Sequence, residues 1–477
     1  MEPSLAGILV CCAILAVARF FEVPSIVALI ASLAFGSTAI VTLPSLGGSS
    51  PMVFVALLMG LLGSIVLRRN WPHDLQRVFV QQPIAWLVLL LSIYTVAGAF
   101  LLPRLFAGEA TVFVPQRIGV VSAGIVETTL EPVSGNVTQT LYFVFGALAF
   151  FALSIMLLRP NTLKAIRQGF FVWATLHVAA GFLDLFGKFA GIEDIFAPIR
   201  TASYAMATIV DVGAFWRIAG TYSEASAFGS VTILLLAFTF TYWRQTRNKS
   251  ALSLTVLLII LLTLCTSTTA YVAGAIIAVL FGVSFARSVL QNRLQAGEIG
   301  FVCVGIGVLA VTIGIEAYSA RALAPLWNLF DAMIFNKASS ASGYERAYWN
   351  YQSLVSVYET MGLGIGLGSS RASSWIISAI SQFGVIGSAM LGLLTWEIIR
   401  SKRHAAFLSP DTRAAVLSVR AAALGSLLAA SIGGGAADPG LVFFIALAVA
   451  SSVTARARNA VPIVMMAPPM MAAPRPA

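Results

Sequence analysis

One segment of the chain combines a cation and a carboxylate at a spacing that could support chemistry. It reads WRIAGTYSEASAFGS, with Arg217 and Glu224 seven residues apart and Tyr222 between them. Arginine binds phosphate oxygens through two parallel hydrogen bonds, and a carboxylate can take the proton of a hydroxyl group. The segment could therefore hold a phosphate and activate a hydroxyl. The alternative is a structural Arg–Glu pair, two helical turns apart, near the start of a helix.

A second segment, SGYERAYWNYQ, places polar groups among aromatic rings. On a helix, Arg346 and Asn350 would lie one turn apart, with Tyr348 and Trp349 beside them. Aromatic rings with an arginine and an amide suit sugar faces and diphosphate oxygens. The alternative is a belt of aromatic residues at a membrane surface.

Alternating glycines follow, and the segment GLGIGLGSSR ends at Arg371. Gly366 and Gly368 would allow backbone N–H groups to approach a ligand closely. The spacing is not that of a dinucleotide-binding motif. The alternative is a flexible turn that leads into the next helix.

The elements that position these residues are predicted to be membrane helices. The 477 residues are 59% hydrophobic and only 10% charged, and the mean hydropathy is +0.91. Soluble globular proteins carry about 25% charged residues, so a soluble enzyme is excluded. We expect an all-α polytopic membrane protein with about 13 transmembrane helices, in a single membrane domain over 1–458 and with a flexible cytoplasmic tail at 459–477. The expected helices are 4–20, 23–43, 51–67, 84–102, 139–158, 169–187, 227–243, 250–266, 268–286, 299–318, 373–396, 413–433 and 439–454.

Charge predicts the orientation of these helices. With the N-terminus outside, 20 of the 29 Lys and Arg residues fall on the inner side, in or beside short loops or in the C-terminal segment. The net charge of +10 is then a topology signal and does not indicate a nucleic-acid partner. The long loops, at about 103–138, 188–226 and 319–372, face outward, so function is expected on that side.

Three motifs carry a resemblance to a known family. They are RIAGTYSEASAFG at 217–229, TLCTSTTAYVAGAIIAVL at 263–280, and ERAYWNYQ followed by GLGIGLGSSRASSWIISAISQFGVIG within 345–387. Over about 200–400, the chain resembles the bacterial O-antigen polymerase and O-antigen ligase superfamily, the Wzy-like polysaccharide polymerases. The resemblance implies a multi-pass protein of the bacterial inner membrane whose active site faces the periplasm.

The resemblance also implies a reaction. A glycan is transferred from undecaprenyl diphosphate to a sugar hydroxyl of a lipid-linked repeat unit, with inversion and without a metal or cofactor. Implied partners are this lipid-linked oligosaccharide, the lipid bilayer, a chain-length regulator and a flippase. The proposed catalytic residues are Glu224, Arg217 and Arg346. The proposed substrate-binding residues are Tyr222, Arg371, Tyr348, Trp349, Asn350, Gly366 and Gly368.

One departure from the family pattern bears on the reaction type. Ligases of the superfamily carry a functional histidine just after the glycine-rich stretch, whereas this chain reads SSRASSW there. The sequence therefore favours an O-antigen, exopolysaccharide or capsule-type polymerase. An O-antigen ligase-type transferase stays an alternative, and a polysaccharide flippase or secondary transporter is the alternative from another class.

Overall fold

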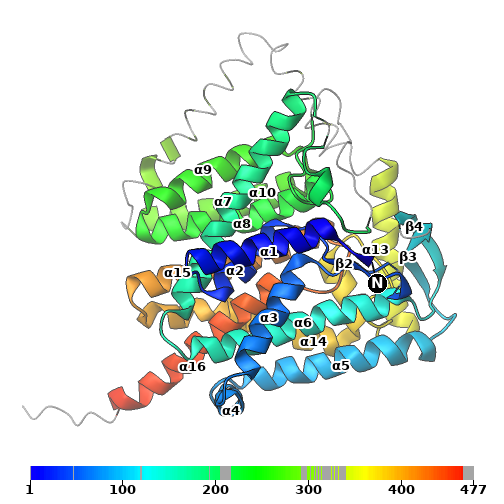
Figure 1. Cartoon of the computed structure of the whole chain (residues 1–477), viewed down its shortest axis with the longest axis horizontal. Coiled ribbons are helices and arrows are strands. Elements are labelled where there is room, and N and C mark those ends of the chain that lie inside the picture. The colour runs from blue at the N-terminus through cyan, green and yellow to red at the C-terminus, as the bar shows by residue number, and fades with distance from the viewer. Residues whose placement is uncertain are drawn as a thin grey trace, which may run out of the picture.

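A computed structural model of the protein describes residues 2–46, 48–118, 121–192, 194–204, 216–291, 298–300, single positions between 302 and 331, and 340–465. The described helices are α1 (Leu5–Phe20), α2 (Ser25–Ala31), α3 (Val53–Val66), α4 (Trp71–Gln81), α5 (Ile84–Leu105), α6 (Ser134–Leu157), α7 (Thr162–Phe189), α8 (Ala225–Thr246), α9 (Lys249–Leu264), α10 (Thr268–Leu290), α13 (Ala341–Glu359), α14 (Trp375–His404), α15 (Pro410–Gly433) and α16 (Leu441–Met465) (Figure 1). Two antiparallel pairs of strands accompany them: β1 (Glu2–Pro3) with β2 (Val41–Thr42), and β3 (Thr111–Ile118) with β4 (Val121–Thr129).

The helical membrane architecture agrees with the expectation from the sequence. In the described part of the chain, eight helices are long and apolar enough to cross a membrane: α5, α6, α7, α8, α10, α14, α15 and α16. The bent pair α3 and α4 would make nine, whereas α1, α9 and α2 with the 3₁₀ turn Ser32–Ala34 are shorter. The count of about 13 is not confirmed, and most of the expected helix 299–318 lies outside the described residues. The last helix continues to Met465, past the expected start of the tail at 459.

The expected helix over 23–43 is much shorter than predicted. It ends at Ala31 because the following chain turns away to pair with the 217–224 segment. The Ser37 amide donates to the Thr221 carbonyl at 3.1 Å. A Cβ on Gly36 would lie only 2.2 Å from the Tyr222 ring. Non-helical backbone inside a membrane protein is tolerated where other protein groups satisfy it, and this segment meets that condition.

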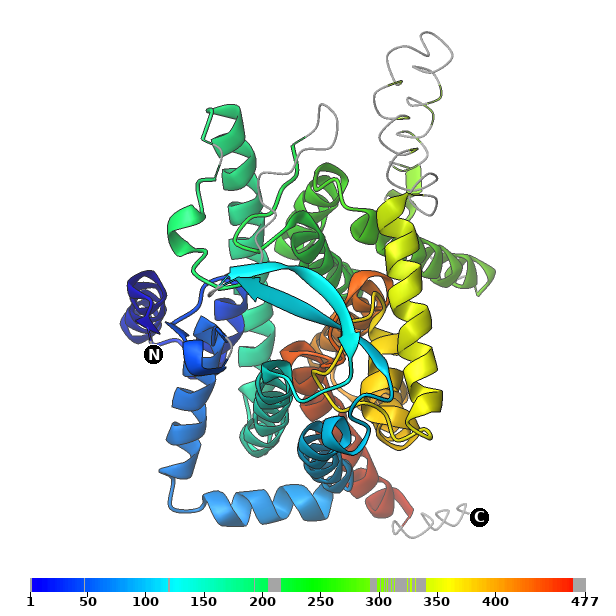
Figure 2. The ribbon, with the colours of Figure 1, turned by 90° about the vertical axis from the view of Figure 1, so that its right-hand side faces the viewer.

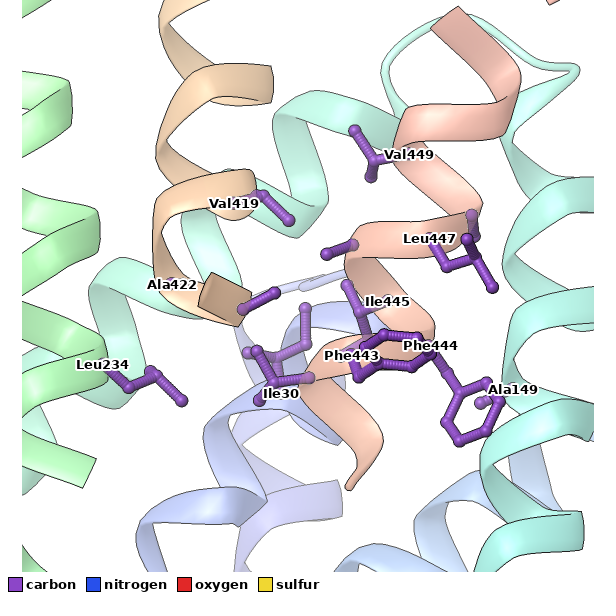
Figure 3. Packing of buried hydrophobic residues seen from close by; sticks show 14 of the residues in the cluster. Ile30, Ala149, Leu234, Val419, Ala422, Phe443, Phe444, Ile445, Leu447 and Val449 are labelled. Atoms are coloured by element: carbon purple, nitrogen blue, oxygen red, sulfur yellow. The ribbon is translucent and has the colours of Figure 1, made fainter. Parts of the chain in front are cut away.

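The core is built around α16. Its residues from Val442 to Ala455 are buried, and such a helix, apolar on all sides, belongs at the centre of a bundle. Phe444 packs edge-on against Phe143 of α6, with ring centroids 5.4 Å apart. Figure 3 shows side chains of α2, α8, α15 and α16 gathered in the same cluster.

One end of the bundle carries β1–β2, the β3–β4 hairpin and α13, and we call it the hairpin end. The N-terminus lies there, whereas α16 runs out at the opposite end (Figure 1). Seen along the helices, the hairpin crosses the bundle beside α13 (Figure 2). Sequence reasoning did not predict this hairpin inside the 103–138 loop. The chain from 217 to 224 and the chain from 434 to 440 reach this same end, because α8 and α16 begin from them.

The glycine-rich segment at 362–368 fills a break in α14. The helix is interrupted at Gly384, which has φ 64° and ψ −168°. The Ile365 amide donates to the Ser381 carbonyl at 3.0 Å, and the Val385 amide donates to the Gly362 carbonyl at 2.8 Å. Unpaired backbone groups are costly within a membrane, so these bonds let α14 break without leaving its peptide groups unsatisfied.

We predict that Gly384→Ala strongly destabilises the protein. The new Cβ would lie 2.3 Å from the Leu363 carbonyl oxygen, and an L-residue is also strained at this φ. We expect a loss of roughly 3 kcal/mol or more, because such backbone strain alone costs about 1–3 kcal/mol. The measurement is membrane abundance and the apparent melting temperature in detergent. Gly392→Ala in the same helix is the control, since a Cβ at Gly392 meets nothing within 4 Å. Equal behaviour of the two variants would contradict the docking.

Candidate functional site

The segment that carries Arg217 and Glu224 is fixed by a buried carboxylate of α7. The Asp184 Oδ2 accepts hydrogen bonds from the amides of Ala219, at 2.8 Å, and Gly220, at 3.0 Å. Lys188, one helical turn further on, lies 3.5 Å from the same oxygen. Asp184 is 2% exposed, so its charge is balanced entirely within the protein. A pairing of His177 with Asp184, which their spacing on one helix face allows, does not form, since His177 Nε2 contacts the Thr232 hydroxyl at 2.8 Å.

Further contacts hold the backbone of this segment. Lys188 donates to the Arg217 carbonyl, and Arg200 donates to the Gly220 carbonyl. The Thr221 hydroxyl donates to the Ala34 carbonyl. The loop is thus rigid where the two expected site residues emerge from it.

The Arg217 side chain lies beside the turn between α9 and α10. Its Nε is buried without a hydrogen-bond partner. Burial raises the pKa of the Cys265 thiol, and the positive charge of Arg217 partly opposes this larger effect. Cys265 in turn lies close to the second turn of α8, because a Cβ at Gly229 would be 3.5 Å from its Sγ. Among the described residues, no ion pair joins Arg217 to Glu224. The seven-residue spacing therefore does not produce the structural pair that it allowed.

Glu224 lies near a different arginine. It is the N-cap residue of α8, in an extended conformation, and accepts a hydrogen bond from the Ser226 hydroxyl. Its carboxylate acts electrostatically on Arg371. Arg371 is exposed as a whole, but packing removes water from its guanidinium, which lowers the pKa of that group, and Glu224 partly restores it. The structure thus brings together two residues that are far apart in the sequence.

The position of Arg371 depends on the hairpin and on the loop after α15. Its backbone amide donates to the Phe113 carbonyl at 2.9 Å, and the neighbouring Ser370 hydroxyl accepts from the Phe113 amide at 3.0 Å. Its guanidinium covers Gly435, where a Cβ would lie 3.0 Å from Nε. A side chain at 435 would therefore displace the guanidinium.

Asp438 is a further carboxylate in the same loop. One oxygen accepts from the Gly440 amide at 3.2 Å, and the side chain is half-buried. Burial raises the pKa of Asp438 to about 6, against the opposing effect of the Gly440 amide. The Trp375 indole fixes the loop by donating to the Ala437 carbonyl at 3.0 Å. Asp438 also interacts electrostatically with the Tyr142 side chain of α6.

We call Arg217, Glu224, Arg371 and Asp438 the Glu224 cluster. Arg217 lies on the segment that leads to Glu224, Glu224 interacts electrostatically with Arg371, and Arg371 covers Gly435 in the loop that carries Asp438. Four helices begin beside it, namely α8, α10, α14 and α16. The start of α10 belongs to this group because Thr269 packs against Gly433, where a Cβ would lie 2.5 Å from its hydroxyl. Helix N-termini carry partial positive charge, so they add to the two arginines in attracting an anion.

The α13 residues lie at the hairpin end and pack on the β-hairpin. The ring of Phe113 lies 5.7 Å from that of Tyr348 and 6.0 Å from that of Trp349. Asn350 accepts a hydrogen bond from the Ser373 amide at 2.7 Å, which ties α13 to the chain just after Arg371. Arg346 is exposed. Among the contacts of the described residues, none joins Arg346 to the Glu224 cluster, so its expected catalytic role stays a prediction.

The remaining expected binding residues have structural partners. Tyr222 is 6% exposed, and its hydroxyl donates to the Leu33 carbonyl at 3.1 Å. Gly366 and Gly368 have positive φ and pack on other backbones, with a Cβ 2.7 Å from the Gly98 oxygen and 2.2 Å from the Gly135 oxygen, respectively. The need for glycine at these positions is thus explained by close packing.

Sequence reasoning missed Asp438 and the role of Asp184 in fixing the loop. The available signal for Asp438 was the run GGGAADPG between two apolar helices, where a lone carboxylate follows three glycines.

As a whole, the cluster can bind an anion and accept a proton. In comparisons with known proteins, no family model matches this chain, and no curated protein matches it significantly. Its chemistry is therefore argued from its own side chains.

We predict that Asp184→Ala destabilises the protein by about 3–5 kcal/mol, the usual cost of leaving a buried ionic partner uncompensated. The variant leaves Lys188 without its counter-charge and two buried amides without their acceptor. Asp411→Ala is the control: it removes an ion pair with Arg167 whose carboxylate is 70% exposed, and it should cost at most about 1 kcal/mol. The apparent melting temperature in detergent measures both. A larger loss for Asp411→Ala would refute the anchoring role of Asp184.

Proposed function

We propose that this protein is a membrane glycosyltransferase that polymerises lipid-linked oligosaccharide repeat units. The observation that carries the proposal is the Glu224 cluster, whose two arginines and two carboxylates lie on the segments that lead into α8, α14 and α16, with Glu224 and Arg371 interacting. Such an arrangement at the end of a bundle of apolar helices suits a substrate with a charged head and a lipid tail. The sequence resemblance to the O-antigen polymerase and ligase superfamily supports the same assignment.

The arginines suit the donor. In the proposed reaction, the bond between the anomeric carbon of the donor sugar and the diphosphate oxygen breaks, and negative charge develops on the leaving undecaprenyl diphosphate. Arg371 and Arg217 would stabilise that charge, since preorganised cations are most effective where charge develops. The buried Nε of Arg217 has no protein partner, so it can donate to a phosphate oxygen.

The carboxylates suit the acceptor. A sugar hydroxyl of the second repeat unit attacks the anomeric carbon from the face opposite the diphosphate, which inverts the configuration. Its proton passes to a carboxylate as the new C–O bond forms. Glu224 is our choice for this base, because it lies at the start of α8 and interacts electrostatically with Arg371. Asp438 is the second carboxylate able to accept or relay the proton.

The aromatic face of α13 suits the glycan. Tyr348 and Trp349 pack with Phe113 beside the segment that leads to Arg371. Their rings offer an apolar surface to sugar rings, and Arg346 adds an exposed cation on the same helix. We propose that this face guides the oligosaccharide toward the cluster.

We further propose that the hairpin end faces the periplasm of a bacterial inner membrane, where a flippase would deliver the substrate and a chain-length regulator would act on the product.

We predict that Glu224→Gln lowers polymerisation about 10²–10⁴-fold, the usual effect of removing a general base. Single lipid-linked repeat units should accumulate while the protein stays at normal abundance in the membrane. Arg217→Lys should also reduce activity, because lysine cannot form the planar bidentate contact. Glu109→Gln, which changes an exposed glutamate before the hairpin, is the control and should leave polymer length normal. Normal polymer from Glu224→Gln would refute the base assignment.

We predict a pH dependence that comes from Asp438. Its raised pKa means that the carboxylate is protonated below about pH 6 and ionised above it. If the ionised form takes part in proton transfer, kcat/KM should rise as the pH increases through about 6. Asp438→Asn should lower the rate and remove this rising limb, whereas Glu109→Gln should keep it. An unchanged limb in Asp438→Asn would assign the titration to another group.

A further inference from the structure

The end of the bundle opposite the hairpin carries two adjoining pockets lined by arginines. The first has a volume of about 250 Å³ and is lined by Arg77 of α4 and Arg456 of α16. The second has a volume of about 190 Å³ and is lined by Arg400 of α14 and Arg458 of α16. The two pockets share Gln82 in their walls.

Positive charge dominates both pockets. Four arginines line them, and the one carboxylate among the lining residues, Glu397, is already paired with Arg400. The Arg400 Nε is buried without a hydrogen-bond partner. Four positive charges less one negative charge leave an excess of three, which an anion can neutralise.

The walls of the pockets are preorganised. Arg456 is held by donating to the Leu157 carbonyl at 2.7 Å, at the C-terminal end of α6. Gln82 is 2% exposed and accepts a hydrogen bond from the Ser451 hydroxyl at 2.7 Å. A general preference for positive charge in loops does not require such convergence, since Lys402 and Arg403, which line neither pocket, meet it equally well.

An apolar surface leads away from the second pocket along α5. Ile84 and Leu87 line the pocket itself. Beyond them, Trp86, Leu90 and Ile93 are 60%, 57% and 58% exposed on a helix that is apolar enough to span a membrane. The α4 helix lies at 102° to α3, as a helix in the plane of a membrane surface would. A ligand with an anionic head and acyl chains fits this combination better than a free anion.

We propose that these pockets bind the phosphodiester headgroup of an anionic phospholipid, with its acyl chains along α5. Basic pockets between membrane helices are known to hold such headgroups. The site lies at the other end of α16 from Asp438 and does not depend on the proposed reaction.

Native mass spectrometry of the full-length, delipidated protein in detergent tests this site. Phosphatidylglycerol and phosphatidylethanolamine with the same acyl chains are titrated separately. Wild type should bind phosphatidylglycerol at least about tenfold more tightly. The double variant Arg77→Gln/Arg456→Gln should lose on the order of 30-fold in phosphatidylglycerol affinity, given the usual contribution of each arginine near an anionic surface.

The matched control is Lys402→Gln/Arg403→Gln, which removes the same charge from exposed positions of α14 and should change the affinity less than about threefold. Equal binding of the two lipids by wild type would overturn the proposal even if the pocket variant failed to fold. An equal loss in the control would also overturn it, because general surface charge would then explain the binding. Displacement of the lipid by an equimolar amount of inorganic phosphate would show a site for free anions and refute the lipid assignment.

Discussion

The docking of the glycine-rich segment into broken α14 is the constraint on which the hairpin end depends. A helix that breaks within a membrane must find partners for its freed peptide groups. Here the segment at 362–366 supplies them, and Gly364 and Gly384 approach so closely that neither tolerates a side chain. From this contact the chain runs past the hairpin, where the Arg371 amide bonds to the Phe113 carbonyl, and then enters α14. The position of the arginine thus follows from the way a break in a helix is satisfied.

The Glu224 cluster is assembled from three segments, and each is held by a different device. The Arg217 segment is fixed by the buried charge of Asp184, the Arg371 segment by the docked glycines and the Phe113 backbone, and the Asp438 loop by the Trp375 indole. These anchors lie outside the cluster itself. Its charged side chains are therefore left with few protein partners, which is the state that a site for an anionic substrate requires.

Helix α16 links the two charged ends of the molecule. It begins just after Asp438, is buried on all sides from Val442 to Ala455, and then presents Arg456 and Arg458 at the far end. Its apolar middle needs no specific partner and packs by shape, as Phe444 does against Phe143. Polar function is thus confined to the two ends of the helix, where charged groups reach water or headgroups.

The sequence by itself determined the helical membrane class, because apolar runs of about 20 residues permit little else. It also singled out Glu224 and Arg371 as residues able to do chemistry. It placed Tyr348 and Trp349 in a long outer loop, where the structure has helix α13. Only the tertiary structure decided that Glu224 lies near Arg371, that Tyr222 is buried and that the alternating glycines are packing positions. Pairing between residues some 150 positions apart depends on how helices cross, and an apolar pattern does not encode the crossing. The hairpin and Asp438 were not predicted for the same reason. Short strands and single polar residues are positioned by contacts with residues distant in the sequence, and a local pattern does not show those contacts.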